Sequence, residues 1–206
     1  MVSDVESGQR LTFAITGASG SIFAVEMLRA LAADSRVTRV DLVVSDAALR
    51  VLAEEMQLSG RNGLVEKLLD SNNSSAKFTQ HAEADIGAAI ASGSYRSSGM
   101  IVLPCSMGTL AGIANGLASN LIERAADVTL KERRPLVLCI RETPFNHIHL
   151  RNMQFASDAG ATIFPVMPAF YNHPESTEKM ARNFAHRVLA HVGLLQPGAY
   201  EWKGED

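Results

Sequence analysis

Three short turns that carry serine each follow an apolar run and precede a helical pattern. Leu11–Thr16 leads into Gly17-Ala18-Ser19-Gly20, Val40–Val44 ends at Ser45, and Met100–Pro104 leads into Cys105-Ser106-Met107-Gly108-Thr109. The first backbone N–H groups of a helix lack intrahelical partners and lie at the positive end of the helix dipole, so such turns attract anions. Three of them on one sheet predict a ligand with a phosphate and a polar body, such as a nucleotide or a flavin.

The turn Gly17–Gly20 does not match the common dinucleotide motifs. Ala18 and Ser19 follow Gly17 where G-x-G-x-x-G requires a second glycine, and no tyrosine precedes a lysine by four residues as short-chain dehydrogenases require. A hydroxyl inside the turn favours contact with a monophosphate or a flavin edge. The alternative is a glycine turn that only lets strand and helix pack closely.

Charged side chains near the later strands form a second candidate set. Arg141 and Glu142 directly follow the apolar run Leu136–Ile140. At the carboxyl end of a strand, Arg141 could bind a phosphate or a flavin carbonyl, and Glu142 could act as an acid or base. Arg124 and Lys131 are about two helical turns apart and therefore share a helix face, where they could bind a second anion.

Each member of this set also has an ordinary structural explanation. An Arg-Glu dipeptide is more often a solvated surface pair. Asp127 lies between Arg124 and Lys131 and could pair with either. Tyr171 follows the last strand region, and Arg187 borders the apolar stripe of the final helix, where it is either an anion ligand or a side chain that extends along the surface. Spacing alone leaves these alternatives open.

The elements that must position these residues alternate strand and helix. Apolar runs predict strands over Leu11–Thr16, Val40–Val44, Met100–Pro104, Leu136–Ile140 and Thr162–Val166. Helical periodicity is expected over Ser21–Ala33, Asp46–Met56, Ser106–Leu117, Asn120–Glu132, His147–Ala159 and Thr177–Val192. This order predicts an α/β fold: a single doubly wound, Rossmann-like (flavodoxin-like) domain with a mostly parallel sheet. The polar segment Gln57–Gln80 is expected to be a surface excursion with one short helix at Leu64–Leu69.

Length and composition limit the class of protein. The 206 residues suffice for one domain, expected over residues 11–194 between a flexible leader (1–10) and a carboxy-terminal tail (195–206). A net charge of −3 argues against a nucleic-acid binder, and no apolar stretch approaches the ~20 residues of a membrane span. The polar amino terminus is not signal-like, so a cytoplasmic protein is expected.

Cys105 and Cys139 are expected to be buried thiols. His147 and His149 lack a spaced third ligand, so no metal site is expected.

Taken together, the motifs resemble the UbiX-type flavin prenyltransferases, formerly described as aromatic acid decarboxylases. The resemblance covers most of the chain from Leu11 to Leu194. Its segments occur in order: Thr16–Gly20, Pro104–Leu110, Asn120–Val128, Leu130–Leu138, Arg141–Pro144, His149–Met153 and Pro168–Tyr171. Together these segments are specific to the family, whereas the Gly17–Gly20 turn alone is not.

The resemblance implies an enzyme that joins the dimethylallyl group of dimethylallyl monophosphate to N5 and C6 of reduced FMN, without a metal. The product, prenylated FMN, would serve UbiD-type decarboxylases, and a flavin reductase would supply reduced FMN. Carried over by position, the FMN-binding residues would be Gly17, Ala18, Ser19, Ser45, Ser106, Met107, Gly108, Thr109 and Arg141.

The resemblance also implies a second site, for the prenyl phosphate. Its residues would be Lys131, Glu142, Tyr171 and Arg187, with Arg124 reaching in from a neighbouring subunit of a dodecamer. Glu142, Ser19 and Lys131 would have catalytic roles: proton movement, a hydrogen bond near flavin N5 and binding of the departing phosphate. Trp202 resembles a tryptophan that some members place near that site.

Two other functions remain open. One is an FMN-dependent cysteine decarboxylase, which usually has a histidine in the early helix region, whereas Ser21–Ala33 contains none. The other is a non-catalytic FMN carrier or accessory subunit of a decarboxylase. Such a carrier would have no need of Lys131, Glu142, Tyr171 and Arg187 together, so their presence favours an enzyme.

Overall fold

Six parallel strands form one sheet, and the direction in which strands are added changes between β1 and β4. The computed structural model describes residues 8–69 and 75–201. Its strands are β1 (Gln9–Ile15), β2 (Val37–Val44), β3 (Phe78–His81), β4 (Gly99–Cys105), β5 (Leu136–Ile140) and β6 (Thr162–Ile163), in the order β3-β2-β1-β4-β5-β6. This confirms the predicted doubly wound α/β fold, in which ligands bind at the carboxyl ends of the strands beside such a switch point.

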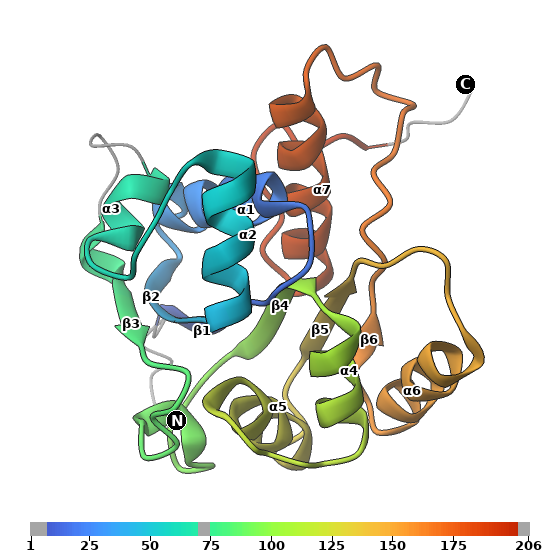
Figure 1. Cartoon of the computed structure of the whole chain (residues 1–206). Helices are drawn as coiled ribbons and strands as arrows, with labels where there is room; N and C mark the ends of the chain where they lie inside the picture. Colours follow the sequence, from blue (N-terminus) through green and yellow to red (C-terminus); the bar gives the residue numbers. More distant parts are fainter. Residues whose placement is uncertain (1–7, 70–74, 202–206) are drawn as a thin grey trace, which may run out of the picture.

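Helices cover both faces of the sheet (Figure 1). The helices on one face are α1 (Ser21–Ala33), α2 (Asp46–Met56), α3 (Leu64–Leu69) and α7 (Thr177–His191). The helices on the other face are α4 (Met107–Ala114), α5 (Leu121–Lys131) and α6 (His147–Asp158). Two short 3₁₀ turns span Ser75–Lys77 and Ala89–Ala91. Across the described residues, none of the helices combines the length and apolarity needed to cross a membrane.

Alternation along the strands divides the core into two clusters. In β1, Leu11, Phe13 and Ile15 point to the face covered by α1 and α7, whereas Ala14 points to the face covered by α4 and α5. Because both faces are buried, these strands read as unbroken apolar runs in the sequence. That is why β1, β2, β4 and β5 were predictable.

The observed elements differ from the expected ones within Gln57–Gln80 and by two or three residues at the bounds of several other elements. α3 has its expected bounds, but Leu64 and Leu69 are fully buried, so the segment belongs to the core. The edge strand β3 was missed because Phe78–His81 is mostly polar. β1 begins at Gln9, two residues before the expected strand, and β2 begins at Val37, three residues before the expected one. β6 ends at Ile163 rather than Val166. α4 ends at Ala114, three residues early, and Gly116 just beyond it has a φ of 64°.

A buried carboxylate on β2 ties the long segment before β4 to the sheet. Asp41 is fully buried, and its carboxylate pairs with Arg39 at 3.0 Å, lies 2.8 Å from His81 Nε2 and accepts a hydrogen bond from the Tyr95 hydroxyl. Burial alone would raise the pKa of Asp41. The hydrogen bonds from His81, Arg39 and Tyr95 outweigh burial and lower the pKa to about 2.

This network is expected to contribute acid-sensitive stability. The folded-state pKa lies below the unfolded value of 3.8, so the contribution is present above pH ~4 and is lost as the pH falls towards 2. The Asp41→Asn variant should be less stable by about 2 kcal/mol at pH 7 and should lose less stability on acidification. Urea unfolding of both proteins between pH 7 and 3 measures this. Equal losses of stability on acidification in the two proteins would contradict it.

Candidate functional site

The three serine turns meet at one edge of the sheet, at the carboxyl ends of β1, β2, β4 and β5. The Thr16 hydroxyl donates to Pro104 O and accepts from Ser106 N, both at 2.8 Å, and so links β1 to β4. Ser45 N donates to Ile15 O at 3.0 Å, and Arg141 N donates to Cys105 O at 3.1 Å. The predicted FMN residues on these turns therefore share one edge, as expected from the sheet order.

Gly17 allows the first turn to approach the start of α2. A Cβ placed on Gly17 would lie 2.4 Å from the Cβ of Ala47, closer than real Cβ atoms come. Ala47 lies in the first turn of α2, next to Ser45, whose hydroxyl caps that helix by accepting from Ala48 N at 3.0 Å. The absence of a side chain at Gly17 thus brings two of the serine turns together.

The amino termini of α1 and α2 already hold carboxylates. Glu55, near the end of α2, accepts from Ser21 N at 2.7 Å and Gly20 N at 3.0 Å. Burial raises the pKa of Glu55, but hydrogen bonds from Ser19 and from these amides outweigh it and lower the pKa. Glu83 accepts from Asp46 N, the first residue of α2, at 2.9 Å. Both carboxylates lie where a helix dipole stabilises negative charge.

The start of α4 is arranged differently. Ser106 caps it, and the Ser106 hydroxyl accepts from Thr109 N at 3.3 Å and donates to the Thr109 hydroxyl at 3.1 Å. Gly108 is exposed and Met107 is buried. In the described parts of the chain, no hydrogen bond joins a carboxylate to the first turn of α4. Of the three turns, this one offers helix amides to an incoming anion.

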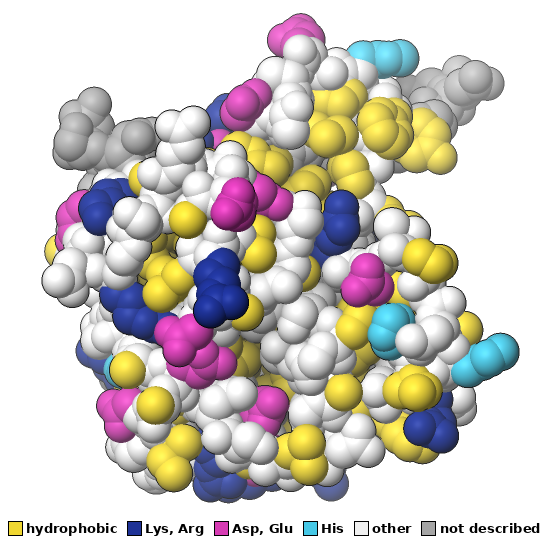
Figure 2. Space-filling view, in the orientation of Figure 1, with side chains coloured by type: hydrophobic (Ala, Val, Ile, Leu, Met, Phe, Trp, Pro, Cys, Tyr) yellow, Lys and Arg dark blue, Asp and Glu magenta, His cyan; other side chains and the backbone are white. Residues whose placement is uncertain are grey.

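Tyr171 and Arg187 line a cavity of about 580 Å³ between the segment after β6 and helix α7. Phe164, Met167 and Phe184 contribute apolar walls, and the neighbouring surface exposes Phe170, at 67%, and Tyr171, at 72%. In the orientation of Figure 1, hydrophobic side chains gather on the surface of the α7 region, above a hollow that separates it from α6 (Figure 2). We call the cavity lined by Tyr171 and Arg187 the Tyr171–Arg187 pocket.

Three of the predicted prenyl-phosphate residues, Arg124, Lys131 and Glu142, do not line that pocket. Arg124 and Lys131 both lie on α5, which covers the opposite face of the sheet from α7. The Arg124 guanidinium pairs with Asp127 at 2.8 Å, and its Nε donates to Ala91 O at 3.1 Å. Lys131 pairs with Glu132 at 2.7 Å. Within one chain, these cations therefore have the ordinary partners that their spacing allows.

Arg141 and Glu142 extend from the end of β5 as exposed side chains, and Glu142 Oε1 accepts from Thr143 N at 2.8 Å.

Both cysteines are free and buried. Burial raises the pKa of Cys105 to about 12 and that of Cys139 well above its usual value, so neither is a thiolate nucleophile. The described residues contain no cluster of three or more His, Cys, Asp or Glu that could hold a metal. Trp202 lies outside the described residues.

Comparison with known proteins settles the family. The flavoprotein family model matches residues 2–185. A flavin prenyltransferase UbiX from Deinococcus radiodurans is 44% identical over 208 residues, covering 100% of both chains. The protein of the same name from Escherichia coli is 43% identical over 189 residues, 92% of this chain and 94% of its own. This chain belongs to the UbiX flavin prenyltransferase family.

Solved structures of UbiX proteins share the whole fold. A dodecameric FMN-dependent UbiX-like decarboxylase from Escherichia coli superposes with a TM-score of 0.85 at 43% identity, covering 95% of this chain and all of its own. AnUbiX, in complex with FMN and dimethylallyl pyrophosphate, gives 0.85 at 40% identity, covering 97% of this chain and all of its own. TvaF, an FMN-dependent cysteine decarboxylase, is 16% identical with a TM-score of 0.55 and shares the fold alone.

Sequence reasoning missed Glu55 and Glu83 in this UbiX family member. Both reach a helix amino terminus from a distant part of the chain, so no local motif marks them. One signal was available for Glu55: the first turn of α1 carries no acidic residue of its own. A helix that begins at a functional turn without such a residue can receive a carboxylate from elsewhere in the fold.

Replacing Glu55 with glutamine is expected to weaken FMN binding roughly tenfold, because hydrogen bonds to a charged group are worth more than those to a neutral one. The carboxylate holds Ser19 and the Gly20 and Ser21 amides, so its loss should loosen the turn expected to contact the flavin. Flavin fluorescence titration measures the change, with Glu54→Gln as the control on the same helix. Equal FMN affinity in Glu55→Gln and wild type would show that the turn keeps its shape without the carboxylate.

Proposed function

We propose that this protein transfers the dimethylallyl group of dimethylallyl monophosphate to N5 and C6 of reduced FMN and releases prenylated FMN. The convergence of Gly17, Ser45, Ser106 and Arg141 at the carboxyl ends of adjacent strands supports the proposal most directly. The AnUbiX complex with FMN and dimethylallyl pyrophosphate, at 40% identity, supports FMN and a dimethylallyl donor that carries phosphate.

FMN fits this edge with its phosphate at the start of α4. Glu55 and Glu83 already neutralise the amino termini of α1 and α2 and would repel a phosphate there. The first turn of α4 offers the amides of Met107 and Gly108 and the hydroxyls of Ser106 and Thr109. Ser19 and Ser45, on the neighbouring strand ends, would then contact the rest of the flavin, and Arg141 would bind one of its carbonyls or the phosphate.

Arg187 and Tyr171 of the Tyr171–Arg187 pocket would bind the second anion, which is the phosphate of the prenyl donor. Breaking the allylic C–O bond releases phosphate, and Arg187 and the Tyr171 hydroxyl would bind its growing charge in place of a metal ion. Reduced FMN supplies the nucleophilic N5 and C6 atoms when bound. Glu142, at the end of β5, would move protons between this site and solvent.

Arg124 and Lys131 complete this site only in an oligomer. Both lie on α5, on the other face of the sheet from Arg187, so they would reach the phosphate of a neighbouring subunit. A dodecameric assembly like that of the Escherichia coli relative would place sites between subunits. The ion pairs of Arg124 with Asp127 and of Lys131 with Glu132 would then hold these cations in place for the neighbour.

The decisive experiment combines the protein anaerobically with reduced FMN and dimethylallyl monophosphate. Mass spectrometry of the released flavin should show the gain of one five-carbon prenyl unit, and omission of the donor should abolish the gain. An unchanged flavin mass with tight FMN binding would overturn the transferase assignment in favour of an FMN carrier.

The proposal includes three further expectations. A UbiD-type decarboxylase would receive the product, a flavin reductase would supply reduced FMN, and the protein would act in the cytoplasm. Prenylated FMN extracted from such a decarboxylase, produced with and without this protein, tests the first of them.

A further inference from the structure

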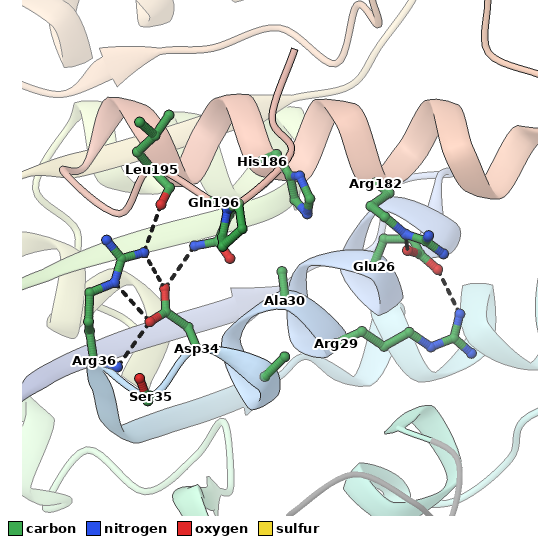
Figure 3. Close-up of a pocket in the computed structure, with 12 residues that line it drawn as sticks. Glu26, Arg29, Ala30, Asp34, Ser35, Arg36, Arg182, His186, Leu195 and Gln196 are labelled. Carbon is green, nitrogen blue, oxygen red and sulfur yellow. Dashed lines mark hydrogen bonds and ion pairs between the residues drawn. The ribbon is translucent and has the colours of Figure 1, made fainter. Parts of the chain in front are cut away.

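The segment that follows α7 folds back against the end of α1. Leu194 is fully buried in the core, and the Gln196 amide donates to Leu194 O and to Asp34 Oδ2, both at 2.8 Å. Arg36 Nη2 donates to Leu195 O at 2.9 Å. Figure 3 shows Asp34 and Arg36, which follow α1, pointing toward Leu195 and Gln196 of this segment.

The side chains of Asp34, Arg36 and Gln196 form one hydrogen-bonded cluster. The Arg36 guanidinium contacts both carboxylate oxygens of Asp34, at 2.9 and 2.6 Å, while Asp34 and Gln196 are 9% and 7% exposed. The hydrogen bond from Arg36 does most to lower the pKa of Asp34, which falls to about 2 with a smaller contribution from Gln196 and against the effect of burial. Buried polar groups with mutual partners specify one arrangement, because each would be costly to leave unpaired.

The segment held in this way separates two cavities. Gln196 and Pro197 line the groove of about 650 Å³ between α1 and α7. Ala199 and Tyr200 line the Tyr171–Arg187 pocket, and Leu195 contributes to both cavities. The part of the chain that Asp34 and Arg36 hold is therefore continuous with one wall of the pocket assigned to the prenyl phosphate.

We propose that Asp34, Arg36 and Gln196 form a latch that holds Leu195–Tyr200 as a wall of the Tyr171–Arg187 pocket, and that they are thereby positioning residues for prenyl-donor binding. This inference rests on the proposed function for the identity of the ligand. The latch lies at the end of α1, whereas the predicted FMN residues lie around its start, so the effect should fall on the donor and not on FMN.

An acid–amide exchange tests the latch. Gln196→Glu places a second carboxylate against Asp34 and should open the latch. KM for dimethylallyl monophosphate should then rise about tenfold, because a hydrogen bond to a charged group is lost. The double variant Asp34→Asn/Gln196→Glu again pairs an acid with an amide beside Arg36, and should return KM to within about threefold of wild type. FMN affinity and kcat at saturating donor should stay unchanged in both.

Arg182→Gln is the matched control. It removes the 2.8 Å pair between Arg182 and the buried Glu26 in the same groove, and Glu26 keeps its contact with Arg29. Arg182 does not line the Tyr171–Arg187 pocket, so the control should lose stability without a change in KM. This separates a positioning role from general destabilisation.

Amide hydrogen exchange over Leu195–Tyr200 provides a readout that needs no activity. Exchange should accelerate at least about tenfold in Gln196→Glu and recover in the double variant. Unchanged exchange in Gln196→Glu, or accelerated exchange with an unchanged donor KM, would overturn the latch. A wild-type protein that leaves FMN unmodified would instead overturn the proposed function, and with it the donor-binding role.

Discussion

Replacing Arg187 with methionine is expected to lower kcat/KM for prenyl transfer by about a hundredfold, since removing one preorganised group that stabilises transition-state charge costs on this order. Arg187 lines the pocket together with Tyr171. Methionine keeps the apolar stem of the side chain but removes the guanidinium, so the departing phosphate would lose a bidentate charged partner. FMN affinity should remain at the wild-type value.

Initial rates of prenylated FMN formation, with a separate FMN titration, measure this effect. Arg182→Met is the control, because Arg182 is an exposed arginine on the same helix that does not line the pocket. Mixing Arg187→Met with Arg124→Met subunits should restore part of the activity, because some sites would then combine wild-type residues from two chains. Activity within twofold of wild type in Arg187→Met would remove this residue from the site.

Replacing Gly17 with alanine is the second change expected to have a large effect. The new Cβ would lie 2.4 Å from the Cβ of Ala47 and 3.2 Å from its carbonyl carbon. Since part of this contact is backbone, the first turn of α2 must move and carry Ser45 away from the flavin edge. Overpacking of this kind costs about 1–3 kcal/mol of stability, and we expect FMN affinity to fall at least about tenfold.

Thermal unfolding with and without FMN, together with flavin titration, separates the two consequences. Gly87→Ala is the matched control, because a Cβ there would meet only Asp85 Oδ1, at an ordinary 3.5 Å. Wild-type FMN affinity in Gly17→Ala would show that α2 can move without disturbing the flavin site.

Local patterns of the sequence determined much of the fold. Apolar runs predicted β1, β2, β4 and β5 because strands buried on both faces need apolar side chains throughout. Helices α1, α2 and α3 have the predicted bounds, since side-chain periodicity and the Ser45 cap are local properties of the chain. The three serine turns were likewise visible in the sequence, because strand, hydroxyl turn and helix follow one another directly.

Only the tertiary structure decided which of these turns remains open to an anion. Glu55 and Glu83 fill the amino termini of α1 and α2 from other elements, and nothing in the local sequence pairs them with those helices. The edge strand β3 depends in the same way on its neighbour, since its residues lack an apolar pattern and its order comes from pairing with β2.

The packing of the helices on the sheet also decided which of the predicted phosphate-binding cations lie apart. Arg124, Lys131 and Arg187 all carry the charge that a phosphate needs, and the sequence identified them. Their division between α5 and α7, on opposite faces of the sheet, follows from how the helices pack. The contact of Gln196 with Asp34 has the same origin, because 162 residues separate the two. The chain thus determined which residues are available for chemistry, and the fold decided which of them meet, because contacts between distant residues exist only after the helices have packed onto the sheet.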